Sequence, residues 1–164
     1  MLYLPEYTIS KFQFREWGKL RANQEKITFI NLQMEHIYGS NDGKGKFIPW
    51  VERKLEENVP YIELTDGIQL RDFVPVEDVA EVYLQVLSEL PMYEGYHSFE
   101  VGTGKAISVR QFVEKLKERF HATTELRFGA IPRSEAEIMW SNAESTSPYL
   151  TSKLRERREK QENG

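Results

Sequence analysis

Residues 26–34 (KITFINLQM) decide the predicted fold of this chain. The stretch is apolar and β-branched with only partial alternation, which is typical of a strand buried on both faces of a parallel sheet. Parallel strands are joined by crossover connections, usually helices. Residues 7–22 carry a helical pattern directly before the strand, with Gly18 in mid-helix, where another backbone is expected to approach closely. The chain is therefore predicted to be an α/β protein.

Helices and strands continue to alternate downstream. Ser108 and Gln111 form a capping box, the clearest helix start in the sequence. The helix over residues 76–90 is expected to turn one apolar side inward (Val79, Val82, Tyr83, Val86 and Leu90). Further helices are predicted over 47–58 and from 108, and strands over 61–64, 68–74, 96–101 and 125–128.

Composition limits the possible classes of protein. The 164 residues suit one domain or a large part of one, and a net charge of −4 argues against a general binder of nucleic acid or anionic membranes. No cysteine is present, and no apolar run is long enough to span a membrane. His36, His97 and His121 lack the spacing of metal ligands, so no metal site is predicted. The expected location is the cytoplasm.

Tyr7 and Lys11 are the first candidate chemical groups. Four residues apart on a helix, they share one face, and a phenol beside an ammonium is a plausible acid–base pair. Two unit charges about 5 Å apart interact by roughly 3 kcal/mol at an effective dielectric near 20, but by less than about 1 kcal/mol in water. The pair is therefore either an acid–base pair that other parts of the protein must shield from water, or a chance spacing on a helix surface.

The loop over residues 38–46 resembles a phosphate-binding loop only in composition. It holds three glycines and two lysines. A Walker loop needs a glycine, four residues, and then Gly-Lys-Ser/Thr, and neither Gly43-Lys44 nor Gly45-Lys46 meets that spacing. A role in substrate binding stays open.

Four segments together resemble the extended short-chain dehydrogenase/reductases that act on nucleotide sugars, the NAD-dependent epimerase/dehydratase family. Tyr7-x-x-x-Lys11 is similar to the catalytic pair of the family, and the other segments follow in family order: 36–39 (HIYG), 69–79 (QLRDFVPVEDV) and 99–109 (FEVGTGKAISV). The resemblance covers roughly residues 5–142. Residues 35–39 and the helix around 12–17 look most like the CDP-abequose synthase type of 4-keto sugar reductase.

The resemblance implies a fold and a set of roles. The fold would be the C-terminal part of a Rossmann-type parallel sheet plus a small α/β substrate-binding lobe. Tyr7 would be the general acid/base at the sugar, and Lys11 would hold the nicotinamide ribose of NAD or NADP, with His36 also beside the cofactor. Arg71 and Arg133 would pair with the diphosphate of a nucleotide-sugar substrate, where planar guanidinium groups suit bidentate contacts.

The chain also departs from the family pattern. The Gly-x-x-Gly-x-x-Gly fingerprint of dinucleotide binding is absent, and only six residues precede Tyr7. Gln33 replaces an expected arginine, and His36 an expected asparagine. We therefore expect residues 1–142 to be a partial domain, inactive alone, and residues 143–164 to be a charged tail.

Two hypotheses follow from the resemblance and the departures. The chain is either the C-terminal portion of a nucleotide-sugar reductase, epimerase or dehydratase, or a non-catalytic assembly module. The module would form a homodimer or complement a separate N-terminal half, with apolar material supplied by Phe12, Phe14 and Trp17.

Overall fold

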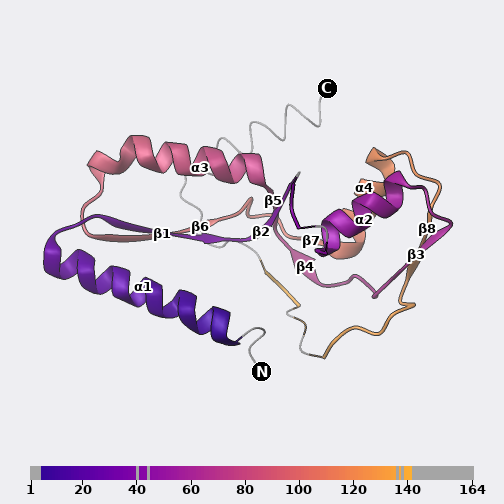
Figure 1. Ribbon diagram of the computed structural model, residues 1–164, viewed down its shortest axis with the longest axis horizontal. Helices are drawn as coiled ribbons and strands as arrows, with labels where there is room; N and C mark the ends of the chain where they lie inside the picture. Colours follow the sequence, from indigo (N-terminus) through magenta and orange to yellow (C-terminus); the bar gives the residue numbers. More distant parts are fainter. Residues whose placement is uncertain (1–4, 40, 44, 136, 138, 142–164) are drawn as a thin grey trace.

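The computed structural model describes residues 5–39, 41–43, 45–135, 137 and 139–141. Two groups of helices and strands lie side by side, joined at the middle by short strands (Figure 1). The predicted tail, 143–164, lies outside the described residues. The first group contains the predicted Tyr–Lys helix, and the second contains the predicted lobe.

The first group is a two-stranded parallel sheet between two helices. Strand β1 (Phe29–Met34) pairs with β6 (Tyr96–Val101) in a register that runs from Phe29 opposite Tyr96 to Met34 opposite Val101. Helix α1 (Pro5–Glu25) covers one face of the pair, and α3 (Val76–Glu89) covers the other (Figure 1). A short 3-10 helix, η1 (Leu90–Met92), ends α3 at Pro91. The predicted α/β class with parallel strands is confirmed.

Alternate residues of β1 face the two helices, as the two-residue period of a strand requires. Leu32 and Met34 pack against the buried cluster that contains Val79 and Val82 of α3. Phe29 points to α1, where its ring centroid is 5.7 Å from that of Phe14. The position of each helix is thus fixed by one face of the same strand.

The second group is the small α/β lobe. Helices α2 (Phe47–Glu56) and α4 (Val109–Arg119) lie beside a parallel pair formed by β3 (Tyr61–Leu64) and β8 (Glu125–Phe128). The predicted capping box at the start of α4 is present, since the Ser108 side chain accepts from the Gln111 backbone and the Gln111 side chain accepts from the Ser108 backbone. The core of the lobe is a cluster of buried apolar residues (Ile48, Val51, Leu55, Ile62, Leu64, Phe73, Val109, Phe112, Val113 and Leu116).

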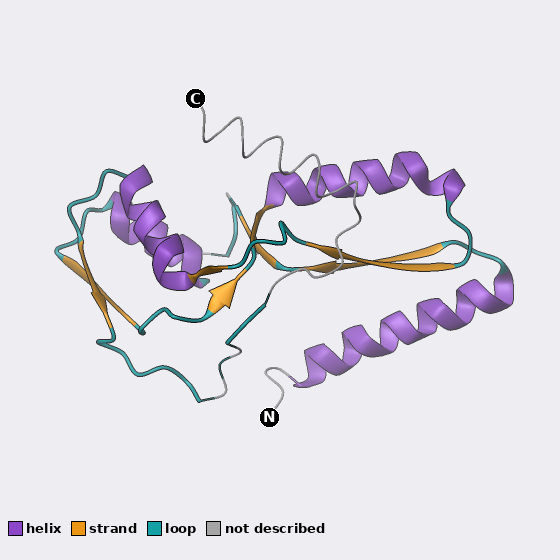
Figure 2. Ribbon diagram, turned by 180° about the vertical axis from the view of Figure 1, so that it is seen from behind, coloured by secondary structure: helices purple, strands orange, loops and turns teal. Residues whose placement is uncertain are grey.

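Short strands connect the two groups. Strand β2 (His36–Tyr38) pairs in parallel with β5 (Phe73–Pro75), and β4 (Leu70–Arg71) pairs antiparallel with β7 (Ile107–Ser108). Figure 2 shows loops crossing between the groups at this level. The name "junction" is used below for Glu35 and β2, for residues 70–75 (β4, Asp72 and β5), for the turn at 102–104 and for residues 137 and 139–141.

Three expectations about the strands are corrected by the structure. The strand predicted over 26–34 begins only at Phe29, because α1 continues to Glu25 and Lys26 turns the chain with a φ of +54°. Its residues are half-buried rather than enclosed on both faces. The strand predicted over 68–74 is split at Asp72, because the backbone there changes partners: Asp72 N–H donates to Ser141, and its carbonyl accepts from His36.

Two further corrections concern the helices. A Cβ built on Gly18 would lie 2.4 Å from the Phe29 ring, so the close neighbour of this glycine is a side chain and not the expected backbone. Tyr83 and Leu90, predicted to point inward from α3, are 50% and 40% exposed. The cause is geometric, because a narrow two-stranded sheet covers only part of the apolar surface of a helix.

Candidate functional site

Tyr7 and Lys11 lie one turn apart near the N-terminal end of α1. The Lys11 Nζ is 5.3 Å from the centroid of the Tyr7 ring. Both residues are exposed, Tyr7 to 61%. In water, charges at such separations interact by less than about 1 kcal/mol. The described chain therefore brings the pair together and leaves it open to solvent.

Arg71 is buried in the junction, with only 6% of its surface exposed. Its Nη1 donates to the backbone carbonyl of Leu70 at 2.7 Å. Its Nη2 donates to the Glu137 carboxylate and forms an ion pair with it. A buried guanidinium without a counter-charge would be strongly destabilising, and Glu137 supplies that charge.

His36 begins β2 beside Arg71. Its backbone N–H donates to the carbonyl of Asp72 at 3.0 Å, and its ring meets Phe73 edge-on, with 5.8 Å between centroids. The residue is nevertheless exposed to solvent. Surrounding protein atoms lower the pKa of His36 by desolvation, the Arg71 charge lowers it further, and the Glu137 charge opposes both. These causes favour the neutral imidazole.

Asp72 ties the strands of the junction to the turn at 102–104. Its side chain is fully buried and accepts hydrogen bonds from the Thr103 hydroxyl and, at 2.8 Å, from the Gly104 backbone. Gly104 has a φ of +70°, a conformation that favours glycine. Asp72 thereby holds the segment next to Arg71 in place.

Glu35 occupies the step between β1 and β2. Its carboxylate accepts a hydrogen bond from the Ser141 hydroxyl, and its backbone N–H donates to Val101 at 3.0 Å. Burial raises the pKa of Glu35, and the charges of Asp72 and Glu100 raise it further, against the hydrogen bond from Ser141. The junction therefore contains a carboxyl group that binds a proton more readily than an ordinary glutamate.

Arg133 lies in the segment that leads from the lobe back to the junction. Its Nη2 is 3.6 Å from a carboxylate oxygen of Asp66, and its Nη1 contacts the sulfur of Met139. The Asp66 backbone carbonyl also accepts two hydrogen bonds from Arg110, at 3.2 and 3.1 Å. Asp66 thus contacts both arginines, Arg133 through its carboxylate and Arg110 through its backbone carbonyl.

The structure divides the predicted site residues into two sets. His36 and Arg71 are brought together in the junction, and Arg133 lies four residues before Glu137, the ion-pair partner of Arg71. Tyr7 and Lys11 form the other set on α1, where Lys11 lies over the Tyr7 ring and the Ser10 hydroxyl donates to the Tyr7 carbonyl. Sequence spacing predicted the contact between Tyr7 and Lys11, but not that His36 and Arg71 come together in the junction.

Sequence reasoning missed three charged residues of the junction: Glu35, Asp72 and Glu137. The roles of all three are set by contacts between segments distant in sequence: Asp72 with Thr103 and Gly104, Glu35 with Ser141, and Glu137 with Arg71.

Comparison with known proteins identifies the family. The model of the NAD dependent epimerase/dehydratase family matches residues 4–102. The chain belongs to this family. It is 37% identical over 150 residues to the CDP-abequose synthase of Salmonella muenchen, an alignment that covers 91% of this chain and 50% of that protein. The chain thus spans about half the length of the curated relatives it matches.

Solved structures share the fold of this family member. UDP-glucose 4-epimerase from Thermotoga maritima, solved with UDP-glucose, aligns with a TM-score of 0.73 and 22% identity over 85% of this chain and 44% of its own. RMD from Pseudomonas aeruginosa, solved with NADPH, aligns with a TM-score of 0.73 and 19% identity over 89% and 48%. These structures confirm the Rossmann-type α/β fold. The matched region is slightly less than half of either neighbour's chain.

None of the helices among the described residues has the length and apolar character of a membrane span. Within the same residues, no group of three or more histidine or acidic side chains is arranged to hold a metal ion.

Proposed function

We propose that this chain supplies the proton-transfer pair and the diphosphate contacts of a nucleotide-sugar reductase, epimerase or dehydratase. The observation that carries the proposal is the Tyr7–Lys11 pair, one turn apart on α1, in a member of the epimerase/dehydratase family. Residues 1–142 would form the C-terminal part of the catalytic domain, and 143–164 a charged tail. The proposed location is the cytoplasm.

Tyr7 is proposed as the general acid/base at the sugar oxygen. Hydride transfer to or from a sugar carbon must be accompanied by proton transfer at the attached oxygen, and a phenol can donate or accept that proton. Lys11 stabilises the phenolate through its charge, provided that the rest of the enzyme excludes water from the pair. The exposed position of Tyr7 on α1 is the reason that this chain alone is expected to be inactive.

Arg71 and Arg133 are proposed as ligands of the substrate diphosphate. Guanidinium groups bind phosphate oxygens through two parallel hydrogen bonds, a geometry that lysine does not offer. Both arginines border the junction, one on β4 and one on the segment that returns from the lobe.

The residues present fit one part of a nicotinamide dinucleotide. Lys11 is suited to the nicotinamide ribose, and His36, whose pKa is lowered mainly by desolvation, can offer a ring nitrogen. The 164 residues contain no Gly-x-x-Gly-x-x-Gly segment to receive the pyrophosphate. When bound, NAD or NADP supplies the hydride, and we propose that its pyrophosphate is received by residues outside this sequence.

The isolated polypeptide provides the first test. Incubated with NADPH or NADH and a 4-keto sugar nucleotide, the purified 164-residue chain is expected to show no turnover above the protein-free rate. Robust turnover would contradict the proposed division of the site, because it would mean that this chain holds the whole dinucleotide by itself.

A second candidate function is an assembly module without catalysis. It is favoured by the exposed apolar side chains of α1, among them Phe12, Phe14 and Trp17, which are 55–66% exposed. A two-stranded sheet is marginally stable by itself, and its open edges can pair with further strands. The module would dimerise or complete a partner of the same fold.

Light scattering separates the assembly candidate from an inert monomer. The assembly module predicts a mass of at least two chains, or a gain in mass on adding the cofactor-binding half of a relative. A monodisperse monomer that gains no mass would contradict it.

A further inference from the structure

Both arginines proposed to bind the diphosphate are already paired with carboxylates of this chain. Arg71 pairs with Glu137, and Arg133 lies 3.6 Å from Asp66. The two pairs differ in their surroundings, because the Arg71 side chain is 7% exposed and the Arg133 side chain 27%. Ion pairs weaken as water gains access, so the Arg71–Glu137 pair is the stronger competitor for any incoming anion.

Each terminal nitrogen of the Arg71 guanidinium donates a hydrogen bond within this chain. Nη1 donates to the Leu70 carbonyl at 2.7 Å, and Nη2 donates to Glu137. A bidentate phosphate contact needs a pair of adjacent N–H groups on one edge of the guanidinium plane. A diphosphate that takes the edge of the guanidinium used by Glu137 must displace this carboxylate from Nη2.

We propose that Glu137 is an internal competitor of the substrate diphosphate at Arg71. The inference rests on the proposed function, in which Arg71 is a diphosphate ligand. In the unliganded chain Glu137 neutralises the buried guanidinium, which would otherwise be costly to keep dry. A diphosphate carries more negative charge than a carboxylate and can replace it, whereas a singly charged anion gains little from the exchange. Glu137 thereby selects for multiply charged ligands.

The backbone beside Glu137 does not depend on its carboxylate. The Leu70 N–H donates to the Met139 carbonyl at 2.9 Å, and the Ser141 N–H donates to the Leu70 carbonyl at 3.2 Å. Asp72 N–H adds a third bond to Ser141, at 3.1 Å. These bonds attach residues 139–141 to β4 through main-chain groups alone. Removing the charge of Glu137 is therefore expected to change the competition at Arg71 and to leave the junction in place.

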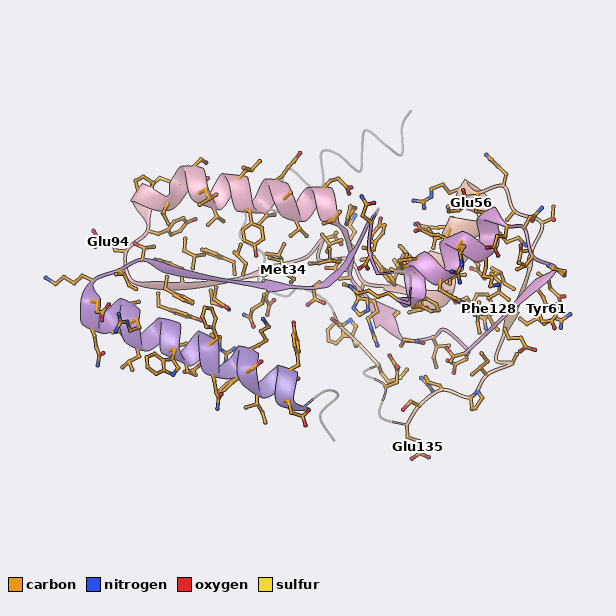
Figure 3. The ribbon with its side chains drawn as sticks, viewed as in Figure 1. Met34, Glu56, Tyr61, Glu94, Phe128 and Glu135 are labelled. Atoms are coloured by element: carbon orange, nitrogen blue, oxygen red, sulfur yellow. The ribbon has the colours of Figure 1, made fainter. Side chains whose placement is uncertain are left out.

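Glu135 offers a matched control. It is two residues from Glu137, exposed, and directed away from the molecule on an outer loop (Figure 3). Glu135→Gln changes net charge by the same amount as Glu137→Gln without touching Arg71. Any difference in probe affinity between the two variants therefore reports the Arg71–Glu137 contact and not the change in net charge.

Isothermal titration calorimetry of the full chain tests the proposal with three probes: inorganic pyrophosphate, CDP and UDP. Glu137→Gln is expected to bind pyrophosphate about tenfold more tightly than the wild type, because a charged hydrogen bond is replaced by a neutral one. Glu135→Gln is expected to match the wild type. In an Arg71→Gln background, Glu137→Gln should bring no gain, which assigns the effect to this pair.

The outcomes separate this inference from the proposed function. If the wild type and Glu137→Gln bind the probes equally, and both lose binding when Arg71→Gln is added, Arg71 remains a diphosphate ligand. The proposed competition by Glu137 would then be wrong. If no probe binds to either protein, both proposals fail. Circular dichroism establishes that each variant is folded. Glu137→Ala repeats the test should the glutamine variant not fold, and unchanged affinity in it would equally overturn the competition.

Discussion

At the scale of single residues, the junction is a set of mutually dependent charges. Arg71 lowers the pKa of His36, and Glu137 partly cancels that effect. Glu35 and Asp72 lie close enough for the Asp72 charge to contribute to the raised pKa of Glu35. One substitution in this set should therefore be visible in the titration of another member, independent of any ligand.

The first prediction concerns His36. Glu137→Gln removes the negative charge that favours the imidazolium, so the pKa of His36 should fall further below its ordinary value. A titration followed by NMR of the His36 ring protons measures the shift, with Glu135→Gln as the control that leaves it unchanged. An equal or higher pKa in Glu137→Gln would show that Glu137 and Arg71 are not paired near His36 in solution.

The second prediction concerns Glu35 and the pH dependence of stability. Because its folded-state pKa is raised, the native state holds this proton at pH values where the unfolded chain has lost it. The site therefore loses stability as pH rises from the unfolded value, about 4.3, through the folded pKa. Glu35→Gln should raise the melting temperature at pH 7, and the gain should vanish near pH 4.

The control for this prediction is Glu94→Gln, at an exposed glutamate on the turn before β6 (Figure 3). Scanning calorimetry at several pH values should give it no pH-dependent gain. A Glu35→Gln variant that is less stable than the wild type at pH 7 would contradict the assigned burial of the charged group.

At the scale of elements, local sequence predicted whatever depends on local interactions. The strands β3, β6 and β8 have the predicted bounds, and the Ser108 capping box starts α4 as expected. The break at Asp72 could not be predicted, because it arises where the backbone exchanges one partner for another that is distant in sequence. The same reason hid Glu137, whose role is set by a contact across 66 residues.

The third prediction concerns the contact between α1 and β1. Gly18→Ala should gain up to about 1 kcal/mol in helix propensity. The new Cβ, however, would lie 2.4 Å from the Phe29 ring, and overpacking of this kind costs about 1–3 kcal/mol. The free energy of unfolding in urea is therefore expected to fall by about 1 kcal/mol.

Phe29→Leu provides the matched test, because a smaller side chain leaves room for the Cβ. Gly18→Ala should be neutral or stabilising in the Phe29→Leu background. If Gly18→Ala stabilises the otherwise unchanged chain, α1 does not lie against β1 as described.

At the scale of the whole molecule, the two sets of site residues lie in different parts of a fold that covers about half of its relatives. The Tyr7–Lys11 pair is open on α1, and α1 and α3 expose apolar side chains on both sides of a two-stranded sheet. Sequence motifs predicted the family and the pair. They could not predict how exposed the pair is, because exposure depends on what packs beside α1.

Reconstitution of hydride transfer tests whether this chain supplies the proton-transfer pair to a site that a cofactor-binding half completes. The chain is mixed with the cofactor-binding half of the Salmonella muenchen CDP-abequose synthase, and loss of NADPH absorbance is followed with a 4-keto sugar nucleotide. We expect no activity from either part alone and activity from the mixture. With Tyr7→Phe, the rate of NADPH oxidation by the mixture should fall by at least about 100-fold. Turnover by the isolated chain, or a mixture whose activity is unaffected by Tyr7→Phe, would contradict the proposed function.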